Sequence, residues 1–420
     1  MKQFAIVMLF IFSTGVLPAG AQGGFVFQKP WHVLGFFDCE NAELERICEY
    51  NINQLEAIDS SYAKVVAIFD RPYQRSVDSS VRIFDITRDQ DRSRIISNSI
   101  SIGERDMGTA EVLDEFLSKY LGARNILIIK AHGYGILSPP SLRPGYNSPQ
   151  DPFVISRVLR DRIDSPIEVM IFDSCNMASV EVAYEFRDLV SVMVASQDLM
   201  YYSLDIVGKP VHSSRPGIDY IDLVLKLKPH SDPMTVGYNV VRSFTEIVNK
   251  KDALYYKATI SALDLTQLDI SVFKTAADKI LAGFADPKTR HLYMAGLLKT
   301  LESASFFHPL GRNHILTHYD VADFLDHLEE NLDIRLNRPR STVIQSYSNN
   351  FVNRATGLSV LFFKDLSGVS DDRRRELFDK YSRSAFAKAT GWGRLMEEYH
   401  DYLEYRGTAI EKRYPEGAGP

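Results

Sequence analysis

The chain of 420 residues holds few cysteines, no excess of basic residues and, after its N-terminal segment, no long apolar run. Three cysteines are an odd number, so at least one thiol has no partner within the chain. Lysine and arginine total 48 against 54 aspartate and glutamate residues, which excludes the basic footprint of a nucleic-acid-binding protein. Internal repeats and low-complexity tracts are also absent, so an ordinary globular fold is expected.

The N-terminal segment is the exception to this shortage of apolar runs. Phe4–Pro18 is almost entirely apolar, Lys2 is the only charge before residue 22, and Ala19-Gly20-Ala21 offers small residues for cleavage. The apolar run is shorter than the roughly 20 residues that a membrane span needs. We therefore predict a signal peptide over residues 1–21, cut after about Ala21, and a secreted or periplasmic protein with no stable membrane insertion.

Periodicity predicts an α/β protein. About 400 mature residues exceed one typical domain. Short apolar runs alternate with amphipathic stretches up to residue 205, which is typical of a parallel sheet with helices on both faces. We therefore expect a core over residues 22–265 and a smaller, mainly helical C-terminal region over 266–420. The predicted strands are Trp31–Phe37, Ala63–Phe69, Val81–Thr87, Ile126–Ile129, Ile167–Phe172, Val190–Ala195, Ala258–Leu263 and a late strand near 357–363. The predicted helices are Glu43–Ile58, Gly108–Leu121, Val154–Ile163, Asn176–Leu189, Ile218–Lys226, Met234–Val248, Gln267–Leu281, His291–Ser303 and the tail Asp371–Tyr405, with polar loop at Asp89–Ser101.

Two of the predicted strands end in reactive side chains. Ile126–Ile129 leads into Ala131-His132-Gly133-Tyr134-Gly135, and Ile167–Phe172 leads into Asp173-Ser174-Cys175. Because open parallel sheets place ligand chemistry at the carboxyl ends of their strands, we expect His132 and Cys175 to face one crevice. This pattern is typical of a cysteine nucleophile with an acid/base partner.

The residue types suit cleavage of a peptide bond. Cys175 is expected to open the helix Asn176–Leu189, where N-terminal amides favour the thiolate. His132 titrates near neutrality and can protonate the leaving amine. Gly133 has no side chain, so its N–H and that of Cys175 can form an oxyanion hole. The alternatives are an inert buried thiol and a structural loop histidine.

The other two cysteines are expected to remain unpaired. Leu44, Ile47 and Leu55 give the surrounding segment a helical period. Nine residues along a helix span roughly 13 Å, beyond the ~5.5 Å between bridged Cα atoms. Unless Cys39 lies on a loop that folds back, Cys39 and Cys48 are therefore small core residues.

The motifs resemble those of the clostripain family of cysteine endopeptidases, which share a clan with caspases, legumain and gingipains. The resemblance rests on His-Gly-x-Gly, on Asp-Ser-Cys-Asn-Met-Ala-Ser-Val-Glu over residues 173–181, and on Val194-Ala195-Ser196. Further matches are Asp106-Met107-Gly108, Ser261-Ala262-Leu263-Asp264-Leu265 and Gly357-Leu358-Ser359. The resemblance covers the mature chain. It implies a caspase-like α/β/α sandwich with a mostly parallel central sheet, and an exported endopeptidase with a Cys-His dyad acting on peptides or proteins.

The resemblance also implies a specificity. In this family the acid that matches Asp173 lines the S1 pocket and selects arginine or lysine through a charge-assisted bond. The alternative for Asp173 is an N-cap of the following helix. Asp205 is the second candidate for the pocket, although the motif around it is altered, and Asp198 is expected at the surface. Ser174, Asn176 and Tyr134 depart from the family pattern but leave the reacting atoms in place.

No cofactor is required by this chemistry, and we predict no metal site. The resemblance makes calcium possible, but the sequence has no EF-hand spacing. His314, His318 and Asp320 would bind a metal only if helical, and no catalytic glutamate completes a zinc-protease motif. Two other functions stay open. One is a catalytically silent member that binds peptides or glycans, and the other is a transpeptidase or ligase that uses the same acyl-enzyme.

Overall fold

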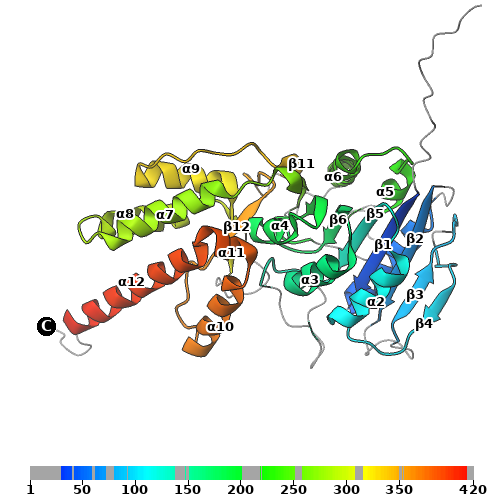
Figure 1. Ribbon diagram of the computed structural model, residues 1–420, viewed down its shortest axis with the longest axis horizontal. Helices are drawn as coiled ribbons and strands as arrows, with labels where there is room; N and C mark the ends of the chain where they lie inside the picture. The colour runs from blue at the N-terminus through cyan, green and yellow to red at the C-terminus, as the bar shows by residue number, and fades with distance from the viewer. Residues whose placement is uncertain are drawn as a thin grey trace, which may run out of the picture.

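The computed structural model describes residues 30–39, 42–58, 62–71, 80–91, 93–137, 147, 151–200, 218, 220–250, 258–307, 316–349, 352 and 354–413. The predicted signal peptide, Asp205 and His314 lie outside these residues. In Figure 1 the large sheet lies at one end of an elongated molecule, and α8, α9 and α12 lie at the other.

Within the described residues, nine strands form one sheet in the order β11-β8-β7-β6-β5-β1-β2-β3-β4. The central run from β7 to β2 is parallel, and the outer strands on both sides are antiparallel. The expected α/β fold with its parallel central strands is confirmed. The strands are β1 (Trp31–Asp38), β2 (Ala63–Asp70), β3 (Arg82–Asp85), β4 (Ser99–Ser101), β5 (Asn125–Lys130), β6 (Ile167–Asp173), β7 (Val190–Ala195), β8 (Thr259–Asp264) and β11 (Val343–Ser348).

Helices cover both faces of this sheet because alternate strand residues point to opposite sides. On one face Val33, Ile126 and Val169 pack with residues of α1 (Ala42–Leu55), α5 (Tyr220–Lys226) and α6 (Pro233–Lys250). On the other face Leu34, Leu127 and Met170 pack with residues of α2 (Ala110–Tyr120), α3 (Pro152–Arg162) and α4 (Val180–Phe186). The result is a three-layered α/β/α arrangement.

The C-terminal region shares the second of these cores. Trp392 is fully buried and packs against Phe273, Phe324 and Phe362. Among the described residues a second sheet has the order β12-β10-β9. The remaining elements are η1 (Leu265–Gln267), α7 (Ser271–Ala285), α8 (Arg290–Ser303), β9 (Phe306–Phe307), β10 (Thr317–Asp320), α9 (Val321–Leu332), β12 (Ser359–Phe362), α10 (Asp371–Ser382), α11 (Ala385–Thr390) and α12 (Trp392–Arg413). No helix in the described part of the chain combines the length and apolar character that a membrane crossing needs.

The division at residue 265 stays a prediction, but two features cross it. β11 belongs to the predicted C-terminal region, yet it pairs with β8 and completes the large sheet. The core that contains Leu127 of β5 also contains Trp392 of α12. Packing within the described residues therefore joins the two predicted parts.

The helix predicted over Asn176–Leu189 was placed too early. α4 begins at Val180, and the Ser179 hydroxyl accepts a hydrogen bond from the Val182 N–H. Asn176 adopts the left-handed conformation with φ of 56°, which no α-helical residue has. The chain therefore turns at Asn176, and residues 177–179 lead from this turn to the helix, with Ser179 extended and bridged to Ser359. The polar loop predicted over residues 89–101 likewise ends in a short strand, β4.

The expectation of unpaired Cys39 and Cys48 was wrong. The two residues form a disulfide, with their Cα atoms 6.7 Å apart. Cys39 directly follows β1, and α1 begins only at Ala42, so the distance along a helix does not apply to the pair. The bond ties Cys39, directly after β1, to Cys48 within α1. Cys175 is the free cysteine.

Candidate active site

The loops after β5 and β6 lie side by side at the carboxyl edge of the sheet. Lys130 and Asp173, the last residues of the two strands, are in register. A Cβ atom added to Gly133 would overlap the Cys175 carbonyl oxygen and would lie 3.1 Å from the Cys175 nitrogen and 2.9 Å from Ser174 Cβ. The main chains beside His132 and Cys175 are therefore in contact, and only glycine permits this approach.

The Cys175 thiol is held by the main chain of Met200. Its Sγ accepts a hydrogen bond from the Met200 N–H at 3.2 Å and donates to the Met200 carbonyl at 3.8 Å. Burial raises the pKa of the Cys175 thiol to about 11, against the Met200 hydrogen bond, which lowers it. The carboxylates of Asp198 and Asp173 raise this pKa further. The thiol is therefore protonated near neutral pH.

The expected stabilisation of a thiolate by a helix N-terminus is not found at Cys175. α4 starts at Val180, and its N-cap is Ser179, so the free amides of the helix lie beyond the thiol. Asn176, the residue after the nucleophile, is hydrogen-bonded to the segment after β7. Its N–H donates to the Asp198 carbonyl at 3.1 Å, and its Nδ2 donates to the Gln197 carbonyl at 2.9 Å. The nucleophile loop is thereby fixed to the chain after β7.

Asp198 was predicted at the surface, and this is wrong. The residue is 1% exposed, because the neighbouring strand β8 covers it. The Asp198 N–H donates to Thr259 Oγ1 at 3.0 Å, and its Oδ1 accepts from the Leu199 N–H at 2.8 Å. The sequence held no signal for this burial, because β8 is distant along the chain.

Asp173 lies beneath the nucleophile loop in a buried ion pair. Its Oδ2 accepts hydrogen bonds from Lys130 Nζ and from the Tyr220 hydroxyl, each at 2.6 Å. Asp173 and Lys130 are both 1% exposed. Burial lowers the pKa of Lys130, whereas the charge of Asp173 raises it. The alternative role as an N-cap is not seen, since Ser179 caps α4.

Sequence reasoning missed Lys130 and Tyr220. A signal for Lys130 was present, because a lysine that ends the otherwise apolar run Ile126–Ile129 must be paired if it is buried. Tyr220 comes from α5 and gave no such signal. Asp173 of β6 is therefore held by a side chain from β5 and by another from α5.

His318 packs behind both reactive loops. Gly135 has a φ of 64°, and a Cβ atom there would lie 2.8 Å from His318 Nε2 and 3.2 Å from the Asn176 carbonyl oxygen. His318 lies on β10 rather than on a helix, and it is fully buried. Asp320 accepts hydrogen bonds from Gln197 Nε2 at 3.0 Å and from the Thr356 N–H at 2.6 Å. Asp320 therefore connects the end of β10 to the segment after β7 and to the segment before β12.

A group of three histidine, cysteine or acidic side chains that could hold a metal ion is absent from the residues that the structure describes.

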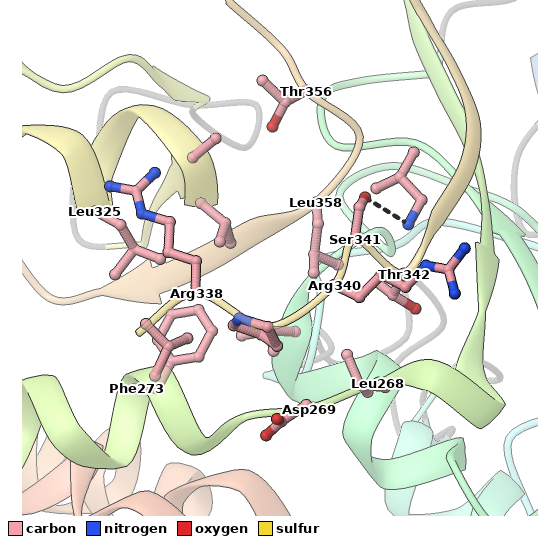
Figure 2. A pocket seen from close by; sticks show the side chains of 16 residues that line it. Leu268, Asp269, Phe273, Leu325, Arg338, Arg340, Ser341, Thr342, Thr356 and Leu358 are labelled. Atoms are coloured by element: carbon pink, nitrogen blue, oxygen red, sulfur yellow. Dashed lines mark hydrogen bonds between the residues drawn. The ribbon is translucent and has the colours of Figure 1, made fainter. Parts of the chain in front are cut away.

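A hollow of about 260 Å³ lies between α7, α9 and the segment before β11 (Figure 2). Its walls are mostly apolar, and Arg338 and Arg340 lie among its polar lining. Arg338 is engaged by Asp326 and Glu329, each at 2.6 Å. The labelled apolar side chains are Leu268, Phe273, Leu325 and Leu358. Residues of the loops after β5 and β6 do not line it, so this pocket is separate from the candidate active site.

Comparisons with known proteins agree with the fold. The model of the clostripain family, peptidase C11, matches residues 36–357. An inactive zymogen C11 protease from Parabacteroides distasonis has a TM-score of 0.56 at 15% identity, over 89% of this chain and 99% of that chain. A secreted C11 cysteine protease from Bacteroides thetaiotaomicron, solved with an irreversible peptide inhibitor, has a TM-score of 0.54 at 14% identity, over 86% and 99%. At these identities the likeness shows the fold. No protein with curated annotation matches the chain.

Proposed function

Because the chain belongs to the clostripain family and is therefore a cysteine peptidase acting on peptides or proteins, we propose that it is an exported endopeptidase with Cys175 as nucleophile and His132 as general acid. The contact between the main chains of Gly133 and Cys175 carries this proposal. This contact supports an arrangement in which the loop after β5 and the loop after β6 both contact the same substrate carbonyl.

In the proposed reaction the deprotonated Cys175 sulfur attacks the scissile carbonyl. The bond to the leaving nitrogen then breaks, and protonated His132 gives its proton to the departing amine. Water attacks the resulting thioester and transfers a proton to His132, and the carboxylic acid and the Cys175 thiolate are released. In both steps we propose that the N–H groups of Gly133 and Cys175 stabilise the negative oxygen.

Because the pKa of the Cys175 thiol is raised, the thiol must be deprotonated when the substrate binds. A thiol with a pKa of about 11 must lose its proton before it attacks. The Met200 carbonyl that accepts from Sγ lies beside it. We propose that a bound peptide displaces this contact and that His132 then takes the proton from Sγ.

Export is supported by two observations. The first is the predicted signal peptide with its cut after about Ala21, and the second is the Cys39–Cys48 disulfide, because such bonds persist in oxidising compartments. We expect N-terminal sequencing of the secreted or periplasmic protein to begin near Gln22. A full-length chain confined to the cytoplasm would contradict this part of the proposal.

We further propose that catalysis requires no cofactor, since the thiol and the imidazole supply both the nucleophile and the proton transfer. Turnover is expected to survive treatment with a chelator. Loss of activity that added calcium restores would show that a metal is needed.

The decisive test is turnover of fluorogenic peptides with Arg, Lys, Asn, Asp or Ala at P1. We expect Cys175→Ala and His132→Ala to lower kcat/KM by roughly 10³-fold or more, as removal of a nucleophile or its partner does in related chemistries. His230→Ala removes an exposed histidine and serves as the matched control. Undiminished turnover by Cys175→Ala would refute the assignment. Mass spectrometry of the products, with an added amine acceptor, separates hydrolysis from transfer.

The preference for arginine or lysine stays a prediction. Asp205, one of its two supports, lies outside the described residues. The other, Asp173, already has the ammonium of Lys130 as its partner. A basic P1 side chain would have to compete with Lys130 for the same carboxylate.

A further inference from the structure

The strands β5 and β6 place a cation and an anion together directly before the two reactive loops. Lys130 and Asp173 are in-register neighbours on parallel strands, so their side chains leave the sheet on the same face. Nζ of Lys130 lies 2.6 Å from Oδ2 of Asp173, and each residue is 1% exposed. The Tyr220 hydroxyl donates to the same oxygen, also at 2.6 Å. The fold therefore neutralises the carboxylate with its own lysine.

This ion pair lies beside the reacting sulfur. Cys175 packs against the core cluster that contains Met200 and Tyr220, and Met200 holds Sγ through its main chain. The charge of Asp173 acts on the thiol of Cys175, and the charge of Cys175 acts on Lys130. A P1 side chain branches from the residue whose carbonyl the sulfur attacks, so it too must lie close to Sγ.

We propose that Lys130 determines the specificity of this enzyme: by occupying the Asp173 carboxylate, it makes the site select an uncharged P1 side chain in place of arginine or lysine. This inference rests on the proposed function, because it concerns the same cleavage reaction. Lys130 acts through Asp173 and is a positioning residue.

The electrostatics of the pair favour a neutral side chain. An arriving guanidinium or ammonium is attracted by Asp173 and repelled by Lys130 at similar distances, so the two Coulomb energies largely cancel. The cost of removing the cation from water remains. A neutral side chain avoids this cost.

The second carboxylate oxygen indicates which neutral side chains fit best. Oδ1 of Asp173 is buried and accepts no hydrogen bond from the described residues. A buried acceptor left without a partner is costly. The amide of a P1 glutamine or asparagine can donate to it without adding a charge.

The test measures kcat/KM for peptides with Arg, Lys, Gln, Asn, Ala or Asp at P1. Wild type is expected to prefer the uncharged peptides. Lys130→Met exposes an uncompensated carboxylate, so the ratio of Arg to Gln cleavage should rise by at least about tenfold, since a desolvated charge pair discriminates strongly. Asp173→Asn leaves the ammonium uncompensated, so cleavage after Asp should rise instead.

Two further variants separate specificity from folding. Lys130→Met combined with Asp173→Asn replaces the ion pair by neutral groups of similar size, and it should keep the uncharged preference even where a single variant fails to fold. Lys64→Met removes an exposed lysine from β2 and should leave every P1 ratio unchanged. A purely structural role for Lys130 would lower all rates together and would not change these ratios.

The outcomes are distinct. Cleavage by wild type that depends on Cys175 and prefers Arg or Lys would overturn this inference and leave the proposed function in place. An Arg to Gln ratio that is the same in folded Lys130→Met as in wild type would also overturn it. Absence of any cleavage that depends on Cys175 would overturn both.

Discussion

The Cys175 thiol lies against the main chain of Met200, near the carboxylates of Asp173 and Asp198, and its pKa is raised to about 11, mainly by burial. The fraction of thiolate therefore increases with pH throughout the neutral range. We predict that alkylation of Cys175 by iodoacetamide accelerates about tenfold per pH unit between pH 7 and pH 9.

Mass spectrometry of the labelled peptide measures this rate, and the disulfide keeps Cys39 and Cys48 from reacting. His132→Ala is the informative comparison, because an imidazolium beside the sulfur would favour the thiolate at lower pH. A rate that already levels off below pH 7 in wild type would contradict a neutral thiol.

Asn176, the next residue, combines a left-handed backbone with a buried amide. Its φ is 56°, and its Nδ2 donates to the Gln197 carbonyl. We predict that Asn176→Ala is less stable than Asn176→Gly by about 1 kcal/mol, because both lose the amide but only alanine has a Cβ atom that strains this conformation. Urea unfolding measures the difference. Equal stabilities of the two variants would show that the backbone relaxes out of this conformation.

At the scale of elements, Glu181 joins α4 to the C-terminal region. Its Oε1 accepts from the Leu361 N–H of β12 at 2.9 Å and from the Tyr381 hydroxyl of α10 at 3.1 Å. Burial raises the pKa of the Glu181 carboxyl to about 7, although these hydrogen bonds lower it. The residue is fully buried, so the charged form is costly within the fold.

The sign of the pH dependence follows from this raised pKa. The carboxyl contributes its full stability below its unfolded pKa of 4.5, and that stability is lost as the pH rises through about 7. We predict that Glu181→Gln, which stays neutral, gains on the order of 3 kcal/mol over wild type between pH 4.5 and pH 8.

Urea unfolding at several pH values measures this gain. Glu302→Gln on α8 changes an exposed glutamate and is the matched control. A constant difference between Glu181→Gln and wild type across the pH range would show that Glu181 ionises in the fold as readily as in the unfolded chain.

At the scale of the whole molecule, the two predicted parts depend on each other. β11 covers the edge of β8, the Gln197 Oε1 accepts from the Gly357 N–H at 2.6 Å, and Trp392 lies in the core shared with β5. We predict that a chain ending at residue 265 aggregates or lacks cooperative unfolding, because it exposes an unpaired strand edge and half of a core.

A chain ending at Arg413 keeps every described element and should unfold in the same single transition as the full chain. Circular dichroism during urea unfolding compares the two truncations. A soluble chain ending at residue 265 with a sharp transition of its own would establish residue 265 as a true domain boundary.

The sequence by itself determined the strand ends that carry the candidate chemistry. β5 and β6 are short apolar runs followed by loop residues, and such local patterns specify a buried parallel strand without knowledge of its neighbours. The position of Gly133 directly after His132 is likewise a property of the local sequence, and its part in an oxyanion hole stays a prediction. These features depend on residues close together along the chain.

Only the tertiary structure decided what surrounds those side chains. Lys130 meets Asp173 because two strands lie side by side, Tyr220 reaches them from α5, and β8 buries Asp198. The Cys39–Cys48 bond likewise depended on where α1 begins. Burial and pairing arise between segments distant in the sequence, and these set the charge of the thiol and of its neighbouring acid. Local periodicity contains no information on them.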